Sequence, residues 1–469
     1  MRRNKGINMY IDYSKSYRRR GRRGSNNLLR ILVVIMISSM LGLGTYYAIK
    51  LQINLQAPDR QAAKDGTAAE GSELASNTGE GTRMNPQSEG QASGNLTEGQ
   101  EPAAEGSSPE GTSDGNGPEG PIPTEPTKAP DEPDTRIPTK VKGLYVTSLA
   151  AGKKSLRDYL IKIAETTEIN ALVIDVKDDN GKITYAMASP LAQSINAVSN
   201  RVPDMEDLVK ELKARGIYVI ARIVAFKDPH LAEQRHDLAI KNADGSLYRD
   251  NNGECWVNPY QKEVWDYLLE VSAKAAATGF QEIQFDYIRF STGKGMDKVD
   301  FGEEAKTKTK EDVILEFTQY AYENLKPLGV FVSADVYGTI ISSKIDAGLV
   351  GQNYVEMSKY LDYICPMIYP SHFGEGNYGI EYPDLEPYNI IRKVLNASKE
   401  KLDEIPEGEH KAIVRPWLQD FTASWLKHYK VYGPDELRQQ IGGVYSAGYE
   451  EWLVWNAACN YSVEGLLRE

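Results

Sequence analysis

The sequence has few cysteines and few histidines for its length. Three cysteines and five histidines occur in 469 residues. Cys255, Cys365 and Cys459 are odd in number and widely spaced, so they predict neither a disulfide framework nor a zinc site. We expect Cys365 and Cys459 to be buried as small apolar side chains. The histidines form no HxH or HExxH pattern, which argues against a metal centre of the amidohydrolase or xylose-isomerase kind.

Motifs for nucleotide cofactors and for serine nucleophiles are also missing. No GxGxxG follows a predicted strand, and neither a Walker loop nor a GxSxG elbow occurs. The formal net charge is −12, and residues 137–469 alone carry −11 by direct count. That sign disfavours binding to the phosphates of nucleic acids. We therefore expect no organic cofactor and no nucleic-acid partner.

A long uncharged run near the N-terminus predicts a membrane anchor. Residues 31–49 contain no charged side chain and are about long enough to cross the hydrocarbon core as a helix. Residues 1–30 hold ten Arg or Lys and one Asp. The positive-inside rule therefore predicts a cytoplasmic tail at 1–30 and export of the rest, as in a single-pass protein of the cell membrane. A cleaved signal peptide is the alternative, but the basic region and the apolar run are both longer than is usual for one.

Residues 50–136 predict a disordered linker. Gly, Ser, Glu and Pro dominate this segment, and large apolar residues are almost absent after Leu55. Residues 51–136 contain sixteen acidic and five basic side chains, so the segment also repels itself. Its r.m.s. reach as a flexible chain is about 55 Å. We expect a spacer that holds residues 137–469 away from the membrane.

Residues 137–469 alternate between apolar runs and amphipathic stretches, which predicts a parallel sheet with helices packed against it. Eight such runs favour a closed TIM (β/α)8 barrel, in which the chemistry lies where the strands end. The strands that we predict are Lys142–Ser148, Ala171–Lys177, Ile217–Ala225, Glu282–Ile288, Val330–Tyr337, Tyr363–Tyr369, Ala412–Leu418 and Glu451–Asn456. The main helical stretches are Leu156–Thr166, Met205–Arg215, Gln261–Ala277, Lys310–Leu325, Pro387–Ser398 and Asp435–Ala447. Between the third strand and its helix, residues 226–259 form a long loop that we expect to be functional.

Two carboxylates mark the ends of neighbouring predicted strands. Side chains alternate along a strand, so Gln284 and Asp286 share one face, and Ser333 and Asp335 share the corresponding face of the next strand. With both faces turned inward, the two carboxylates come within about 5 to 6 Å, a separation typical of retaining glycoside hydrolysis. Asp286 would then be the nucleophile, held ionised by Arg222 or Arg289, and Asp335 the acid/base. The alternative is that one or both acids are structural and pair with barrel arginines.

Other acids and aromatic side chains compete for a role at the barrel mouth. Asp420, after the seventh strand, is the alternative acid/base. Asp175, at the end of the second strand, is expected to support the site by pairing with Lys177 or Arg222. Flat amphipathic rings can bind sugar faces, and amides can bind hydroxyl groups. The substrate-binding candidates are Tyr145, Asp175, Arg222, Trp256, Asn258, Arg289, Tyr337, Tyr369, His372, Arg415, Trp417, Trp455 and Asn456.

Several segments together resemble a bacterial family of predicted glycoside hydrolases of unassigned function. They are residues 143–147 (GLYVT), 171–178 (ALVIDVKD), 256–259 (WVNP), 285–290 (FDYIRF), 333–338 (SADVYG) and 365–372 (CPMIYPSH). The resemblance implies a TIM barrel similar to the α-amylase-like and α-galactosidase-like glycosidases, with the Asp at the end of the fourth strand as nucleophile. In amylase-like barrels the acid/base on the fifth strand is typically Glu, whereas this chain has Asp335.

We therefore expect a membrane-anchored hydrolase, monomeric in its catalytic domain, that cleaves a polysaccharide or oligosaccharide of the cell envelope or its surroundings. The two-carboxylate mechanism needs no metal. The alternative is a catalytically inactive barrel that binds a glycan or scaffolds envelope proteins, since a fold does not by itself establish an activity.

Overall fold

The structure is a computed structural model that describes residue 134 and residues 136–467. The predicted tail, anchor and nearly all of the linker lie outside these residues. Within them, no helix has both the length and the apolar character that a membrane span requires.

Eight parallel strands close into a barrel, which confirms the predicted fold of residues 137–469. Each strand pairs with the next along the chain, β1 also pairs with β11, and a bridge between Met367 and Trp417 completes the ring. The strands are β1 (Lys142–Val146), β2 (Ala171–Lys177), β3 (Tyr218–Val224), β5 (Glu282–Asp286), β7 (Phe331–Tyr337), β8 (Tyr363–Met367), β10 (Trp417–Gln419) and β11 (Trp452–Trp455).

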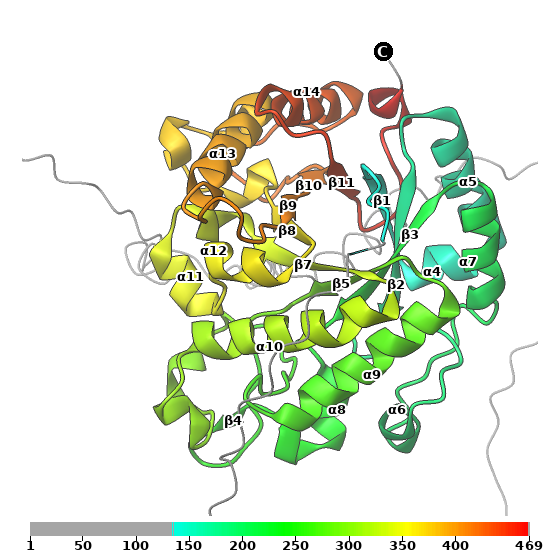
Figure 1. The fold of residues 1–469 in the computed structure, drawn as a ribbon. Helices are drawn as coiled ribbons and strands as arrows, with labels where there is room; N and C mark the ends of the chain where they lie inside the picture. The colour runs from blue at the N-terminus through cyan, green and yellow to red at the C-terminus, as the bar shows by residue number, and fades with distance from the viewer. Residues whose placement is uncertain (1–133, 135, 468–469) are drawn as a thin grey trace, which may run out of the picture. The chain divides into compact units, whose positions relative to one another are not determined.

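Helices surround the strands on the outside of the barrel (Figure 1). Their amphipathic sequences bury one face against the sheet, as Leu212 and Phe317 do. Helix α10 begins with a reciprocal capping box between Thr309 and Asp312, and α9 ends at Gly279, whose φ of 108° is tolerated by glycine. The outer helices are α5 (Lys154–Thr166), α7 (Met205–Ala214), α9 (Lys262–Thr278), α10 (Lys310–Leu325), α13 (Pro387–Leu402) and α14 (Pro434–Ser446).

Seven of the eight predicted strands differ from the observed ones in their bounds, and two of these differences have identifiable reasons. The run Ala412–Leu418 contains β9 (Ile413–Val414) and β10, separated at Arg415-Pro416 because proline has no N–H for the ladder. The fourth strand ends at Asp286 instead of Ile288, because Tyr287 has a φ of 51° and leaves the extended conformation.

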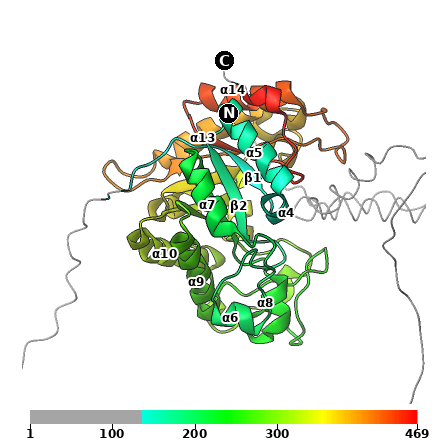
Figure 2. The same ribbon diagram turned by 90° about the vertical axis from the view of Figure 1, so that its right-hand side faces the viewer.

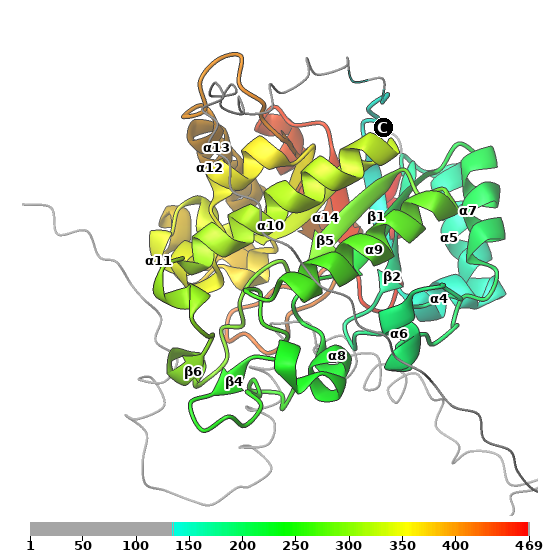
Figure 3. The same cartoon turned by 60° about the horizontal axis from the view of Figure 1, so that its bottom comes forward.

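The long loops after β3 and β5 meet at the carboxyl end of the barrel. Strand β4 (Lys241–Asn242), from the first loop, pairs antiparallel with β6 (Val299–Asp300), from the second. Figures 2 and 3 show α6 (Pro190–Ser194) and α8 (Pro229–Gln234) at this same end of the barrel. A turn spans residues 242–246, where the amide of Asn242 donates to the carbonyl of Ser246. The two loops therefore form one structural unit beside the strand ends.

The chain enters the barrel at the opposite end. Arg136 donates to both carboxylate oxygens of Asp362 at 2.7 Å and to the carbonyl of Val330 at 2.7 Å. Val330 directly precedes β7 and Asp362 directly precedes β8. Arg136 thus fastens the start of the domain to the amino ends of the strands.

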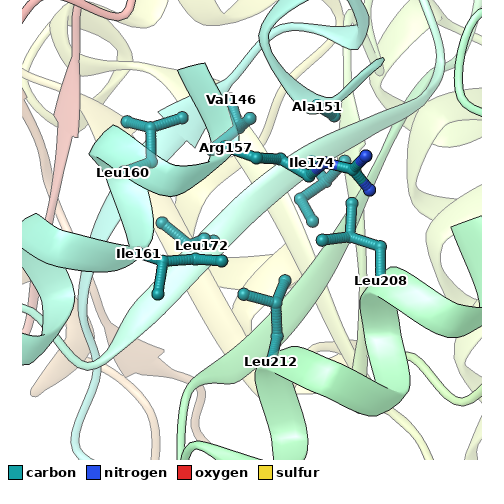
Figure 4. Close-up of a pocket in the computed structure, with 9 residues that line it drawn as sticks. All are labelled: Val146, Ala151, Arg157, Leu160, Ile161, Leu172, Ile174, Leu208 and Leu212. Atoms are coloured by element: carbon teal, nitrogen blue, oxygen red, sulfur yellow. The ribbon is translucent and has the colours of Figure 1, made fainter. Parts of the chain in front are cut away.

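A small apolar hollow lies outside the barrel (Figure 4). Leu160 and Ile161 of α5, Leu172 of β2, and Leu208 and Leu212 of α7 contribute to its lining. It separates the strand layer from the helix layer and contains none of the candidate carboxylates. We interpret it as a packing gap.

Candidate active site

Asp286 is the last residue of β5 and forms a buried ion pair with Arg222. The guanidinium donates from Nη2 at 2.6 Å and from Nε at 3.0 Å, both to Oδ2 of Asp286. Arg222 lies in the middle of the neighbouring strand β3 and is fully buried. Of the two arginines predicted to hold Asp286 ionised, Arg222 makes this contact.

The second oxygen of Asp286 is held by the backbone. The amide of Tyr287 donates to Oδ1 of Asp286 at 2.6 Å. The strand ends immediately after Asp286, and Tyr287 has a φ of 51°. A left-handed backbone is uncommon for a bulky residue and marks stored strain, which tends to occur at functional sites. The strained residue here directly follows Asp286.

Asp335 occupies the neighbouring position on β7. The register pairs Gln284 with Ser333 and Phe285 with Ala334, so Asp286 and Asp335 are the next residues along the two strands. Nε1 of Trp417 donates to Oδ1 of Asp335 at 2.6 Å, across the interior from β10. Burial and the charge of Asp286 raise the pKa of Asp335 well above its usual range, despite the opposing effect of the bond from Trp417.

The two acids therefore have contrasting surroundings. Asp286 faces a cation, whereas Asp335 faces a neutral indole N–H and the negative charge of Asp286. The raised pKa of Asp335 favours the protonated carboxyl that a general acid requires, beside a carboxylate that contacts a cation.

Asp175 supports Arg222 from the other side. Nη1 of Arg222 donates to Oδ1 of Asp175 at 2.7 Å, and the hydroxyl of Tyr145 donates to Oδ2 at 2.8 Å. Burial raises the pKa of Asp175 to about 6, although Arg222 opposes this shift. Lys177, the other partner considered for Asp175, instead pairs with the buried Asp228 at 2.7 Å.

Aromatic rings enclose the guanidinium of Arg222. The rings of Tyr145 and Trp455 stack with centroids 3.9 Å apart, and each centroid lies 5.4 Å from the guanidinium carbon. Tyr369 is also buried at this end, and the charges of Asp335 and Asp286 contribute to raising its pKa after burial. His372 packs edge-on against the Tyr369 ring at 5.1 Å. These residues place aromatic faces and a phenol beside the carboxylates.

A second group of predicted residues lies where the β5 loop begins. The guanidinium of Arg289 is within 5.0 Å of the ring centroids of Trp256, Tyr287 and Tyr337. Trp256 also donates its indole N–H to Asp250 at 3.0 Å. The structure thus brings Trp256, Arg289 and Tyr337 together next to the carboxylates.

Four other predicted residues have their polar atoms engaged in local structure. Both oxygens of Asp420 accept from Ser462, and the amides of Asn258 and Asn456 bond within their own loops or to neighbouring backbone. Arg415 lies deeper in the barrel, where Nη1 donates to both oxygens of Glu282 and Nε donates to Glu451. These contacts favour structural roles for the four.

Sequence reasoning missed an acidic and basic cluster on the loops. Asp179 accepts from Nη1 and Nη2 of Arg222 at 3.2 and 3.3 Å. Lys227 lies 3.2 Å from Glu254 and 3.8 Å from Asp179. Burial raises the pKa of Asp179, but Arg222 and Lys227 outweigh that effect and lower it overall. The adjacent acids Asp178 and Asp179, directly after the second predicted strand, were the available signal.

A family model described as "Putative glycosyl hydrolase domain" matches residues 143–461. No curated protein matches the chain. Because the matched region includes all eight strands and the site, the comparison applies to the whole barrel.

Solved structures give further similarities. A hypothetical protein from Ruminiclostridium thermocellum ATCC 27405 is 38% identical over 41% of this chain and 97% of its own, with a TM-score of 0.38. The glycoside hydrolase domain of PgaB (BpsB) from Bordetella bronchiseptica is 14% identical over 71% of this chain and 100% of its own, with a TM-score of 0.51. The spore cortex-lytic enzyme SleL of Bacillus megaterium QM B1551 is 13% identical over 70% of this chain and 74% of its own, with a TM-score of 0.40. The similarity to the PgaB domain is one of fold.

Proposed function

The chain belongs to the family described as "Putative glycosyl hydrolase domain", and on that premise we propose that it hydrolyses a polysaccharide with Asp286 and Asp335 as the reacting pair. The observation that carries the proposal is their contrast: Asp286 is ion-paired with Arg222, whereas burial and the Asp286 charge raise the pKa of Asp335. Asp286 acts as the nucleophile and Asp335 as the general acid.

The proposed reaction follows the retaining course. Oδ1 or Oδ2 of Asp286 attacks the anomeric carbon while Asp335 gives its proton to the departing glycosidic oxygen. Water then attacks the glycosyl ester, and Asp335 takes the proton back. Adjacent register positions on strands about 4.8 Å apart support this course over inversion, because inverting enzymes need room for a water between the acids.

Three groups assist without reacting. Arg222 donates two hydrogen bonds to the carboxylate of Asp286. Asp175 and Asp179 accept from Arg222 and hold it in place. The stacked rings of Tyr145 and Trp455 present apolar surface that suits the C–H faces of a sugar.

We further propose that residues 31–49 anchor the protein in the cell membrane and that residues 50–136 act as a spacer. The uncharged run and its basic flank support the anchor. The substrate would then be a glycan outside the cytoplasm.

Leaving-group dependence tests the two roles. Asp335→Asn is expected to lose about 10²–10⁴-fold in kcat/KM on an unactivated glycoside but little in kcat/KM on a dinitrophenyl glycoside, whose departure in the first step needs no protonation. Asp286→Asn is expected to lose activity on both. Asp420→Asn is the matched control for the alternative acid/base, and it should behave like the wild type on both substrates.

If Asp335→Asn loses the same factor in kcat/KM on both substrates, Asp335 is not the general acid. A wild-type chain that binds envelope glycans but cleaves none of a broad panel would instead support the inactive glycan-binding barrel.

A further inference from the structure

Arg289 differs from the other buried arginines in its partners. Arg222, Arg289 and Arg415 are the arginines that the described residues bury almost completely. Arg222 pairs with Asp175, Asp179 and Asp286, and Arg415 pairs with Glu282 and Glu451. For Arg289, by contrast, residues 136–467 supply no carboxylate partner.

The contacts of Arg289 are a single hydrogen bond and three aromatic rings. Nη1 donates to the carbonyl of Phe290 at 2.9 Å. The ring centroids of Tyr337, Tyr287 and Trp256 lie 4.7, 4.9 and 5.0 Å from the guanidinium carbon. Nε and Nη2 donate to no acceptor in the part of the chain that the structure describes.

An arginine in this position retains both its charge and its unused donors. The guanidinium does not deprotonate in proteins, and a buried charge is costly unless it is paired. Aromatic faces offset part of that cost but accept no N–H fork. The planar donor pair of an arginine matches the oxygens of a carboxylate or a phosphate.

Arg289 lies next to the two proposed reacting acids. Tyr287 directly follows Asp286, and Tyr337 lies two residues after Asp335. Arg289 and Asp286 act with opposite signs on the pKa of Tyr337, which burial raises, so both charges lie near its ring. When a sugar unit lies at the two acids, one of its substituents or the adjacent sugar unit would therefore lie close to the guanidinium of Arg289.

We propose that Arg289, with the rings of Trp256 and Tyr337 beside it, binds an anionic group of the glycan, so that the substrate carries carboxylate or phosphate oxygens next to the cleaved bond. The inference rests on the proposed function, because it assigns the substrate class of that same site. The other role that the contacts allow is a brace that only fastens the β5 loop through Phe290.

Binding to matched pairs of glycans tests the inference with the full-length chain. One pair is a uronic-acid oligosaccharide and the same oligosaccharide after reduction of its carboxyl groups. The other is a phosphate-bearing oligosaccharide and its dephosphorylated form. The wild type is expected to bind the charged member of one pair about ten-fold more tightly, and the pair that shows this preference identifies the anion.

Two substitutions separate recognition from bracing. Arg289→Met should abolish the preference while leaving the affinity for the neutral member within about two-fold of the wild type. Arg289→Lys retains the charge without the fork and should keep only part of the preference. The lysine variant still tests the inference if the methionine variant does not fold. A preference that is unchanged in both variants, or absent from the wild type in both pairs, overturns the proposal.

The binding readout separates this inference from the proposed function. Cleavage of glycans with no preference in either pair would contradict the anionic subsite and leave the hydrolase in place. A preference that depends on Arg289 without cleavage of any glycan would support the subsite and contradict the hydrolase.

Discussion

Nη2 of Arg222 lies 2.6 Å from Oδ2 of Asp286, and Nε of the same guanidinium lies 3.0 Å from that oxygen. One arginine thus directs two donors at one oxygen of the proposed nucleophile. The same guanidinium also bonds to Asp175 and Asp179, so a single cation serves three carboxylates. Arg222 is therefore expected to stabilise this end of the barrel and to hold the carboxylate of Asp286 in position.

Replacing Arg222 by methionine should destabilise the fold by about 3–5 kcal/mol at pH 7, because it leaves buried carboxylates without their cation. The loss should be smaller at pH 4. Without Arg222 the folded-state pKa values of Asp175 and Asp179 rise, so the cost of burying these two carboxylates grows as the pH increases. Urea unfolding at the two pH values measures the difference. An equal loss of unfolding free energy at both pH values would show that the ionised carboxylates do not need Arg222 for their stability.

Replacing Trp417 by phenylalanine should move the alkaline limb of the kcat/KM profile to higher pH. The indole N–H bonds to Asp335 and lowers its pKa, so removing the bond raises the pKa further. A general acid works only while it is protonated, and its activity is lost as the pH passes its pKa. The matched control is Trp256→Phe, which removes an indole N–H bonded to Asp250 instead. A limb that moves to lower pH would contradict the role of Asp335.

The Asp175→Asn variant should gain stability relative to the wild type as the pH rises from 4 to 7. Burial raises the folded pKa of Asp175 to about 6, above the ordinary value of 3.8. The folded state therefore binds the proton more tightly, and the wild type loses stability between these values as the proton dissociates. The amide of the variant does not titrate. The difference in unfolding free energy between variant and wild type should grow by on the order of 3 kcal/mol across this range. A difference that shrinks would mean that Asp175 is ionised throughout.

Replacing Tyr287 by glycine should give a more stable protein than replacing it by alanine. Both changes remove the ring, but only alanine keeps a Cβ that opposes the φ of 51°. The expected gap is about 1–2 kcal/mol in the free energy of unfolding, measured by urea titration. Alanine is the more stable of the two at ordinary strand or helix positions. If the alanine variant at position 287 is more stable than the glycine variant, the left-handed turn is not maintained.

Much of the barrel could be predicted because its strands are buried on both faces and appear as apolar runs. Strand β2 was predicted with its observed bounds, Ala171–Lys177. The alternation of Gln284 and Asp286, and of Ser333 and Asp335, indicated which side chains face inward. The position of Arg222 on the neighbouring strand followed from the same pattern, so the central ion pair was within reach of sequence reasoning.

Other parts of the site depend on contacts that no local pattern contains. The left-handed turn at Tyr287 follows the end of the strand at Asp286, whereas sequence preference alone extends the strand to Ile288. The side-chain amide of Asn258 donates to the carbonyl of Phe301 in the loop after β5, and the carboxylate of Asp420 accepts from Ser462, which residue type cannot reveal. Lys227 contacts Glu254 of its own long loop and Asp179 of the loop after β2, and the second contact exists only because loops from different strands fold together.

Mass spectrometry of a trapped intermediate tests the central claim most directly. A 2-deoxy-2-fluoro glycoside of a cleaved sugar with a good leaving group slows the second step and leaves the glycosyl group on the nucleophile. We predict a peptide modified at Asp286 in the wild type and no modified peptide in Asp286→Asn. A sugar attached to Asp335 or Asp175, or turnover of the normal substrate with inversion at the anomeric carbon, would contradict the account.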